Sequence, residues 1–347
     1  MNVRAQAFAQ TLTIAVLAGG RSSEHEVSLS SGAAVRDGLL AGGHEVLWVE
    51  IGRDGAWRSG ETRLSVTPGA GLLGADVVFP VLHGPFGEDG TVQGMLETLD
   101  VAYVGAGVAS SAVSLNKVLF KQLMSTGQVP QVDYVGVRED RFRQSAAEVL
   151  DEIAELLLPV FVKPAHLGSS VGIVKVDSSE LMQEALDSAF AHDALVIVEA
   201  SARGAEVECG VLERPSSDRS RQEERALASE PGEILFPGEW YDFNAKYTAG
   251  AMELRIPAPI SPAATERVKE LALRAFTHTG CEGLARVDFF VDGERVVVNE
   301  LNTMPGFTPT SVYAKLMEAS GVPYPALVDQ LCRLALERHA RRRSYRY

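Results

Sequence analysis

The most informative stretch of the chain is Val296-Val297-Val298-Asn299-Glu300-Leu301-Asn302-Thr303-Met304-Pro305-Gly306. Its β-branched beginning is typical of a strand buried in a sheet. Glu300 and Asn302 then stand two residues apart, so on a strand both side chains point to the same face. A carboxylate beside an amide oxygen offers hard oxygen ligands of the kind that Mg²⁺ takes. Taken alone, the pattern also fits a strand end whose polar residues reach solvent.

The strand expected before this stretch carries a second pair of polar side chains. Residues 284–291 are predicted to form a strand, with Arg286 and Asp288 on one face. Asp292-Gly293 is a hairpin signal that joins this strand to the first stretch. Because two adjacent antiparallel strands then both carry polar pairs, we predict a site for a metal and an anion. Asp288 and Glu300 can share one metal only if the hairpin has an odd-length loop or a β-bulge.

Length and composition limit the possible functions. The chain has 347 residues, which predicts two or three domains, and 46% hydrophobic residues supply their cores. A net charge of −14 argues against general binding of nucleic acid or of a membrane surface, since either needs a basic face. The three cysteines are odd in number and widely spaced, which argues against a disulfide framework and a metal cluster and indicates a reducing cytoplasm.

Both ends of the chain contain segments that need an interpretation. The apolar run at 12–18 is short for a signal peptide, so we expect the first strand there, and no apolar run approaches transmembrane length. Near the other end, a helix is predicted at 325–337. It is followed by the arginines Arg338, Arg341, Arg342, Arg343 and Arg346. Cations suit the C-terminus of a helix, and we expect a solvated, frayed tail rather than a binding segment.

The N-terminal part has the pattern of a parallel sheet. Strands are predicted at 11–17 and 45–51, with a helix between them that Ser28 or Ser30 would cap. Gly19-Gly20 lacks the G-x-G-x-x-G spacing, so a dinucleotide site is the less favoured interpretation. Glu26 stands at the head of this helix, where it either complements the helix dipole or holds the ammonium group of a ligand.

Two glycine-rich loops follow strands further along the chain. A strand at 76–82 leads into His83-Gly84-Pro85-Phe86-Gly87-Glu88-Asp89-Gly90, and ligands of open α/β sheets bind at this end of a strand. The second loop reads Lys163-Pro164-Ala165-His166-Leu167-Gly168-Ser169-Ser170-Val171-Gly172. Flexible backbone amides and one lysine are the parts that cradle nucleotide phosphates, although this is not a Walker sequence. We predict that both are binding loops.

The remaining chain starts a new α/β pattern after a boundary near residues 112–118. Strands are expected at 133–137, 159–162, 172–176, 194–199 and 206–212, with helices at 145–158, 178–191 and 261–279. Glu199 ends one of these strands, where it could hold an adenine or a ribose. Residues 213–230 are predicted to be an exposed, charged insertion. The aromatic loop at 241–247 is either a lid or a surface loop pinned by its tyrosines.

Several of these motifs together resemble those of the ATP-grasp carboxylate–amine ligases. They are Lys163-Pro164 with Gly168-Ser169-Ser170, Arg286-x-Asp288, and Asn299-Glu300-x-Asn302-Thr303-x-Pro305-Gly306. Within that family, the D-alanine–D-alanine ligases resemble the chain at Glu26-Val27-Ser28, His83-Gly84-x-x-Gly87-Glu88-Asp89-Gly90 and Lys246-Tyr247. The matches run in the family's order from residue 26 to residue 311. The charged insertion and the arginine-rich end lie outside them.

The resemblance implies an ATP-grasp fold of the α/β class, with α+β architecture in its ATP-binding part. An N-terminal parallel-sheet domain would occupy residues 1–115, a central domain 116–199 and a C-terminal domain 200–347. ATP would lie between the antiparallel sheets of the last two. The resemblance also implies D-alanine and ATP as substrates, two Mg²⁺ or Mn²⁺ ions, and a homodimer.

The resemblance further assigns roles to individual residues. Lys117 and Lys163 would contact the phosphates of ATP, and Glu199 and Glu206 would bind its adenine or ribose. The metal ions would be held by Asp288, Glu300 and Asn302. The first D-alanine would be bound by Glu26 and His83, and the second by Lys246 and Ser311. An oxyanion would be stabilised by Arg286 and the backbone N–H of Gly306. Ser169 and Tyr247 would connect Glu26 with the attacking amine.

The implied reaction makes D-alanyl-D-alanine for peptidoglycan precursors. ATP would phosphorylate the first D-alanine to an acyl phosphate, which the amine of the second would attack. Water would hydrolyse the acyl phosphate, so the loop around 241–250 is expected to close as a lid. Tyr247 favours an amine acceptor over D-lactate. The alternatives are a D-alanine–D-lactate ligase or another ATP-grasp ligase, a nucleotide-binding dehydrogenase that uses Gly19-Gly20, and a non-catalytic ATP-binding regulator.

Overall fold

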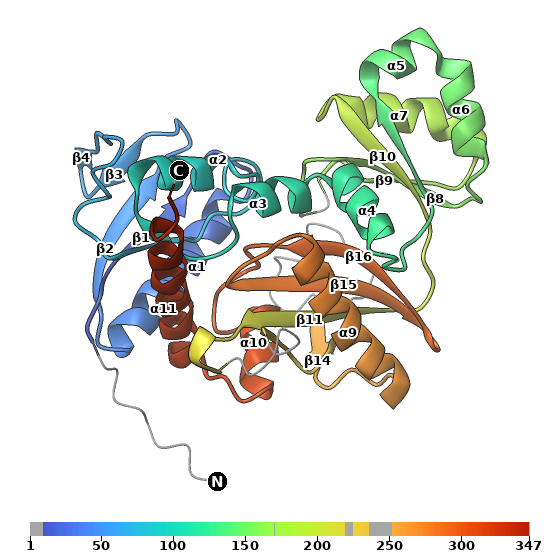
Figure 1. Ribbon diagram of the computed structural model, residues 1–347. Helices are drawn as coiled ribbons and strands as arrows, with labels where there is room; N and C mark the ends of the chain where they lie inside the picture. The colour runs from blue at the N-terminus through green and yellow to red at the C-terminus, as the bar shows by residue number, and fades with distance from the viewer. Residues whose placement is uncertain (1–9, 170, 219–224, 236–251, 347) are drawn as a thin grey trace.

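The computed structural model describes residues 10–169, 171–218, 225–235 and 252–346. Figure 1 shows the first of three sheets at the left and the other two at the right. The first sheet has the strand order β4-β3-β2-β1-β5-β6. Its strands are β1 (Thr13–Gly19), β2 (Glu45–Ile51), β3 (Trp57–Ser59), β4 (Thr62–Arg63), β5 (Val77–Pro80) and β6 (Ala102–Tyr103). Strands β2, β1, β5 and β6 are parallel, which confirms the predicted N-terminal parallel sheet.

Helices α1 (His25–Ala41), α2 (Thr91–Leu99) and α3 (Val108–Leu115) belong to this part of the chain. The expected cap of α1 is wrong, because the helix begins at His25 and neither Ser28 nor Ser30 precedes it. Ser28 lies inside the helix, where its hydroxyl accepts from the N–H of Gly19 at 2.8 Å and donates to the carbonyl of Val81. It therefore joins the carboxyl ends of β1 and β5, where the site lies.

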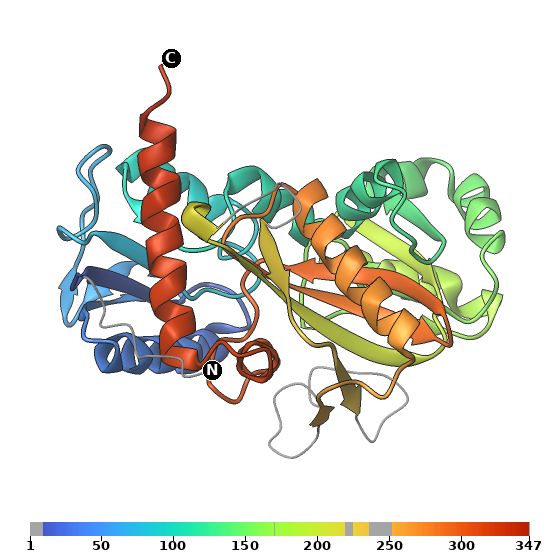
Figure 2. The same ribbon diagram turned by 60° about the horizontal axis from the view of Figure 1, so that its bottom comes forward.

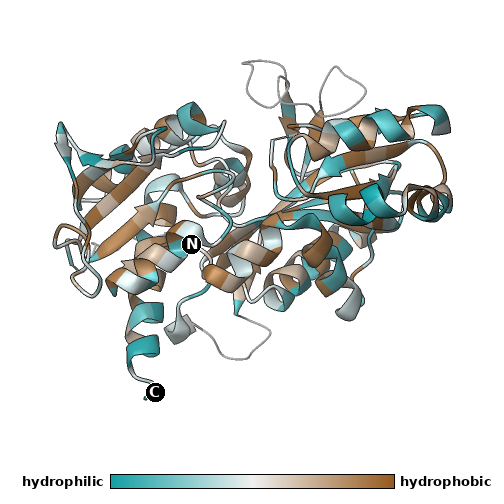
Figure 3. Ribbon diagram, turned by 90° about the horizontal axis from the view of Figure 1, so that it is seen from above, coloured by the Kyte–Doolittle hydropathy of each residue, from teal (hydrophilic) through white to brown (hydrophobic). Residues whose placement is uncertain are grey.

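The second sheet is antiparallel, in the order β7-β10-β8-β9. Its strands are β7 (Tyr134–Arg138), β8 (Val160–Pro164), β9 (Val174–Val176) and β10 (Leu195–Ala200). One face packs under the helices α5 (Glu139–Gln144), α6 (Ala146–Ala154) and α7 (Met182–Phe190), which follows the short 3-10 turn η1 (Ser179–Leu181). Strand β8 alternates accordingly: Val160 and Val162 are buried under the helices, whereas Phe161 and Lys163 point into a cleft. Figure 3 shows how hydrophilic the outer surfaces of these helices are.

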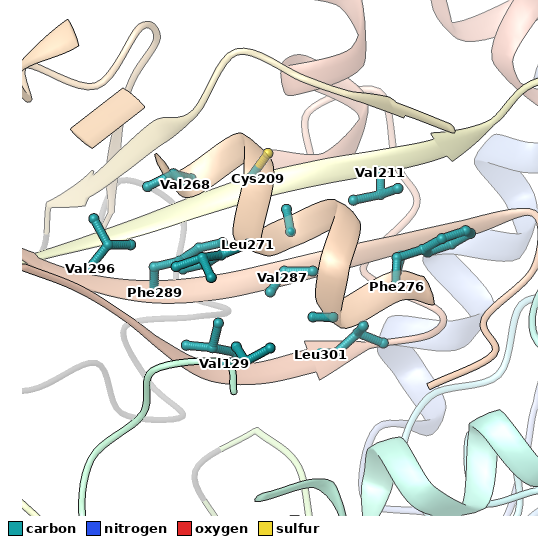
Figure 4. Close-up of a cluster of buried hydrophobic side chains, with 14 of the residues drawn as sticks. Val129, Cys209, Val211, Val268, Leu271, Phe276, Val287, Phe289, Val296 and Leu301 are labelled. Carbon is teal, nitrogen blue, oxygen red and sulfur yellow. The ribbon is translucent and has the colours of Figure 1, made fainter. Parts of the chain in front are cut away.

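The third sheet has the order β14-β13-β11-β15-β16, and β12 pairs with β11 beside it. Its strands are β11 (Ala205–Glu213), β12 (Ala226–Ala228), β13 (Gly232–Leu235), β14 (Glu253–Arg255), β15 (Leu284–Asp292) and β16 (Arg295–Asn302). Helix α9 (Pro262–His278) covers one face, and Figure 4 shows its Val268, Leu271 and Phe276 against this sheet. The helix starts as expected, since the Ser261 hydroxyl accepts from the N–H of Ala264.

The hairpin between β15 and β16 contains the predicted irregularity. Asp292 pairs with Arg295, so the two-residue turn is Gly293-Glu294 and not Asp292-Gly293. A regular ladder from this turn would place Asn299 opposite Asp288. Instead, the register shifts between Asp288 and Phe289, and Asp288 pairs with Glu300. The prediction of an odd-length loop or a bulge is therefore confirmed by a bulge, and the two carboxylates share one face.

Two helices complete the chain. They are α10 (Val312–Ala319) and α11 (Tyr324–Arg343). Helix α11 packs on the first sheet (Figure 2), and its Leu327 and Leu331 belong to one buried core with Ile14 and Val77. The expected limits of 1–115, 116–199 and 200–347 place α11 with the third sheet, and these limits stay a prediction. α4 (Lys117–Thr126) lies between the sheets, capped by the side chain of Asn116.

The interpretation of the arginine-rich end as a frayed tail is wrong. Helix α11 continues to Arg343, and the side chain of Arg338 is buried. Its guanidinium donates to the carbonyls of Tyr103, at 2.6 Å, and Gly105. Arg341 and Arg342 form ion pairs with Glu282 at 2.9 and 3.0 Å. These arginines attach the end of the chain to the body of the protein.

The charged stretch at 213–230 is also less exposed than expected. Glu213 is buried, accepts from the N–H of Gly283 at 2.7 Å and lies 3.4 Å from Arg225. The 3-10 turn η2 (Ser216–Asp218) and strand β12 belong to the same stretch. Its described ends are therefore integrated into the third sheet. Among the helices of the described ranges, none combines the length and hydrophobicity needed to cross a membrane.

Candidate active site

Two clefts meet at the centre of the molecule. The first, of about 590 Å³, lies between the loops of the first sheet and the ends of β15 and β16. The second, of about 540 Å³, lies between the second and third sheets. Both are lined by Lys117, Gly168, Ser169, Glu208 and Glu300. Because the clefts share these residues, groups bound in one can react with groups bound in the other.

Most of the predicted site residues lie in these clefts. The first is lined by Glu26, His83, Ser169, Arg286, Asn302, Gly306 and Ser311. The second is lined by Lys163, Glu199, Glu206 and Asp288. Lys117 and Glu300 line both. Lys246 and Tyr247, and with them the expected lid, lie outside the described residues, so the hydrogen-bonded link through Tyr247 stays a prediction.

The expected hydrogen bond between Glu26 and Ser169 is formed by a different glutamate. Ser169 donates to the carboxylate of Glu24, which is buried. The side chain of Glu26 is 75% exposed at the rim and pairs with Arg53 at 3.2 Å. The sequence interpretation missed Glu24 because it placed the start of the helix too late. With α1 beginning at His25, Glu24 occupies the N-cap position and faces the cleft.

His83 and Glu88 attach the loop of the first sheet to the loop after β16. His83 Nδ1 lies 3.0 Å from the carbonyl of Met304, and burial lowers the pKa of this imidazole, so it is neutral. Glu88 accepts from the N–H groups of Gly84, at 2.8 Å, and Met304, at 3.2 Å. Burial and the nearby charge of Glu24 raise the pKa of Glu88 to about 8. The loop that carries Gly306 is thus held from the opposite side of the cleft.

Arg286 is held by two carboxylates. Its guanidinium donates to both oxygens of Asp288, at 2.7 and 2.6 Å, and its Nε lies 2.9 Å from Glu208. Burial opposes its charge, but Asp288 and Glu208 raise the pKa of Arg286 well above its usual value. Glu208 was not predicted, although Glu206 and Glu208 stand two apart on a strand and so share one face.

The residues expected to hold metal suit a divalent cation. Asp288 and Glu300 lie opposite each other, and Asn302 Nδ2 donates to Asp288 at 3.1 Å. Two carboxylates and one amide do not surround an ion, and no three Asp, Glu, His or Cys of the described ranges form a preformed metal cluster. Mg²⁺ is commonly bound in this way, through one or two carboxylates and the phosphates of its substrate. The donor set therefore fits the implied ions.

The second cleft combines charged and apolar walls. Lys163 Nζ lies 2.5 Å from one oxygen of Glu199, and Lys117 Nζ donates to the carbonyl of Leu167 at 2.6 Å. Phe161, Ile173, Ile234 and Leu235 add apolar surface. Apolar walls beside lysines suit a molecule with a flat base and a phosphate chain. The cleft is thus consistent with the implied ATP.

Two family models match the chain. One, described as "D-ala D-ala ligase C-terminus", matches residues 123–333, and the other, "D-ala D-ala ligase N-terminus", matches residues 13–72 and 63–106. This chain belongs to the D-alanine–D-alanine ligase family. The resemblance to this family, which was proposed from motifs, is therefore confirmed for both the N-terminal and the C-terminal part of the chain.

Individual members of this ligase family are similar over nearly their whole length. The D-alanine–D-alanine ligase of Solibacter usitatus is 42% identical over 338 residues, 97% of this chain and 99% of that protein. The D-alanine–D-alanine ligase of Deinococcus radiodurans is 45% identical over 343 residues, 93% of this chain and 98% of that protein.

Solved structures show the same fold. The D-alanine–D-alanine ligase of Coxiella burnetii aligns with a TM-score of 0.82 and 34% identity over 96% of this chain and 97% of that one. The D-Ala:D-Ser ligase VanG of Enterococcus faecalis aligns with a TM-score of 0.81 and 32% identity over 94% of this chain and all of that one.

Proposed function

We propose that this protein uses ATP to join two D-alanine molecules into D-alanyl-D-alanine for peptidoglycan precursor synthesis. The observation that carries the proposal is that the two clefts meet at Lys117, Ser169 and Glu300. A phosphoryl group held at this junction is within reach of a carboxylate in the first cleft. The family, and relatives named D-alanine–D-alanine ligase along nearly the whole chain, support the same activity.

The first step activates a carboxylate. A carboxylate is a poor acyl donor, so its oxygen attacks the γ-phosphorus of ATP to give an acyl phosphate and ADP. Lys117 and Lys163 neutralise the phosphate chain. Mg²⁺ or Mn²⁺ held by Asp288, Glu300 and Asn302 would supply further positive charge to the transferring phosphoryl group.

The second step forms the peptide bond. The amine of the second D-alanine attacks the acyl carbon, the resulting oxyanion is stabilised by Arg286 and the N–H of Gly306, and phosphate leaves. Preorganised donors aimed at such an oxyanion contribute strongly to catalysis in a dry site. Because Ser169 donates to Glu24, we assign to Glu24, rather than to Glu26, the binding of the first ammonium group and a part in orienting the attacking amine.

The carboxylate of the second substrate would be received at the start of α10. Ser311 is the residue before this helix, and its hydroxyl lies 2.8 Å from that of Thr308. N–H groups at a helix start favour a carboxylate. Lys246 would supply the charge that completes this subsite. The remaining parts of the proposal are a cytoplasmic location, consistent with three free, buried cysteines among the described residues, and a homodimer.

The decisive assay measures ADP release with a coupled enzyme system and identifies the product by mass spectrometry. ADP release with D-alanine alone, together with D-alanyl-D-alanine as the product, is expected. Mixtures with D-serine or D-lactate test the acceptor, since the structural neighbour VanG is a D-Ala:D-Ser ligase. A mixed product formed in preference to the dipeptide would replace the proposed acceptor. No ADP release with any of these substrates would reject the ligase activity.

A further inference from the structure

A buried lysine lies behind the wall of the second cleft. Lys121 follows Lys117 by one turn of α4, and its side chain is 1% exposed. Its Nζ lies 3.0 Å from one carboxylate oxygen of Glu199, while Lys163 Nζ lies 2.5 Å from the other. One carboxylate is thus shared between two ammonium groups. Burial alone would raise the pKa of Glu199, but Lys121 and Lys163 outweigh it and lower the pKa to about 2.

The two lysines differ in what they can reach. Lys163 lines the second cleft, as does Glu199, whereas Lys121 is not among the described residues that line either cleft. Lys121 is enclosed by α4, Glu199 and the ring of Tyr134, whose centroid is 5.7 Å from its Nζ. A nucleotide can therefore contact Lys163 but not Lys121.

This difference matters when a nucleotide arrives. A phosphate that takes the ammonium group of Lys163 draws it away from Glu199. A buried carboxylate that loses its partner is strongly destabilised. Glu199 would then be left in the cleft wall without a counter-charge, unless a second cation stays in place. Lys121 is that cation, because no ligand can reach it.

We propose that Lys121 is a positioning residue for nucleotide binding: it keeps Glu199 ionised and in place, and thereby releases Lys163 to the phosphates. The inference rests on the proposed function, since it takes ATP as the ligand of the second cleft. Without the charge of Lys121, Lys163 would be the only cation paired with Glu199 and would stay in that ion pair. The nucleotide would then have to break a buried ion pair before it could bind.

The test compares Lys121→Met, which keeps the side-chain volume, with Lys121→Arg, which keeps the charge, and with the exposed control Lys315→Met. Calorimetric titration with ADP and Mg²⁺ gives nucleotide affinity without turnover, and the ADP-release assay gives KM for ATP and for D-alanine. Lys121→Met should weaken nucleotide binding and raise KM for ATP by about 30-fold or more, as expected for loss of one partner of a buried charge pair. KM for D-alanine should stay unchanged, and Lys121→Arg should restore most of the affinity.

A double variant separates positioning from a merely structural role. In a Glu199→Gln background there is no carboxylate charge for Lys121 to neutralise. Adding Lys121→Met should then cause no further loss of nucleotide affinity. The same comparison serves if Lys121→Met alone fails to fold, because the double variant removes both charges of the pair. Unchanged affinity in Lys121→Met, or an equal loss in the Glu199→Gln background, would overturn the inference. If instead the unaltered protein neither binds nucleotide nor releases ADP with D-alanine, the proposed function is what fails.

Discussion

Asp288 lies directly opposite Glu300 because strand β16 contains one extra residue, Asn299, in a bulge. The two carboxylates therefore face the same space, although they are separated by a hairpin with a two-residue turn. Residue-by-residue pairing without the bulge would have turned Glu300 to the other face of the sheet. The position of the implied metal ions depends on this single irregularity.

The shared face predicts a shared ion. Asp288→Asn and Glu300→Gln should each raise the Mg²⁺ concentration that gives half-maximal ADP release by about tenfold or more. Because both act on one site, the double variant should lose less than the sum of the two free-energy changes. A Mg²⁺ titration of nucleotide binding and of ADP release measures this. The control is Asp292→Asn, an exposed position at the end of the same strand, and fully additive effects would contradict the shared site.

Glu24 and Glu26 form a matched pair for testing the first subsite. Glu24→Gln removes the charge beside Ser169 and should lower kcat/KM for D-alanine by about 10- to 100-fold, the value of a charge-assisted hydrogen bond. Glu26→Gln, at an exposed position paired with Arg53, should change it by less than about twofold. Steady-state kinetics at saturating ATP separates the two. A larger loss of kcat/KM in Glu26→Gln than in Glu24→Gln would assign the binding of the first ammonium group to Glu26.

Arg286 should affect both turnover and stability. Arg286→Ala should lower kcat by about 10²- to 10³-fold through loss of an oxyanion donor. It should also destabilise the fold by about 3–5 kcal/mol, because Asp288 and Glu208 lose their common counter-charge. Adding Glu208→Gln should recover part of the unfolding free energy, measured in urea, but none of the turnover. Full turnover in Arg286→Ala would refute the assigned role.

The raised pKa of Glu88 predicts that the stability of the protein depends on pH. Its pKa in the folded protein is raised from 4.5 to about 8 by burial and by Glu24. Between these values the folded protein holds a proton that the unfolded chain releases, so the contribution of Glu88 is full below about pH 4.5 and is lost as the pH rises toward 8. In Glu88→Gln, the unfolding free energy should not show this decrease with rising pH. Urea unfolding of both proteins at several pH values tests this expectation, and parallel pH profiles would contradict a protonated carboxyl at Glu88 in the folded protein.

Much of this fold was predictable because its signals are local. The β-branched run at Val296–Val298, the spacing of Arg286 and Asp288, and the glycine-rich loop after Lys163 each fix a strand or loop by short-range geometry. They also required an odd-length loop or a bulge in the hairpin, and the structure has the bulge, at Asn299. The family resemblance then ordered these motifs along the chain. Two of the predicted residues, Lys246 and Tyr247, lie outside the described ranges and stay predictions.

The residues missed by sequence reasoning depend on long-range contacts. Lys121 carries no local signal that it is buried beside a distant partner, Glu199. For Glu208 the local signal is its spacing from Glu206, which places both on one face of a strand but does not show that this face lines a cleft. Glu24 was missed because the start of α1 was placed too late, so the wrong glutamate faced the cleft. The arginines of α11 were read as solvated because their partners, such as Glu282, lie far away in sequence.

The packing of α11 also affects how the protein is made. This helix is synthesised after all three sheets, yet it covers the first of them, with Leu327 and Leu331 against Ile14 and Val77. During synthesis, the face of the first sheet that α11 covers therefore stays exposed until the rest of the chain has emerged from the ribosome. Nascent chains stalled before Tyr324 would expose this apolar surface to chaperones, and release of the final helix would bury it.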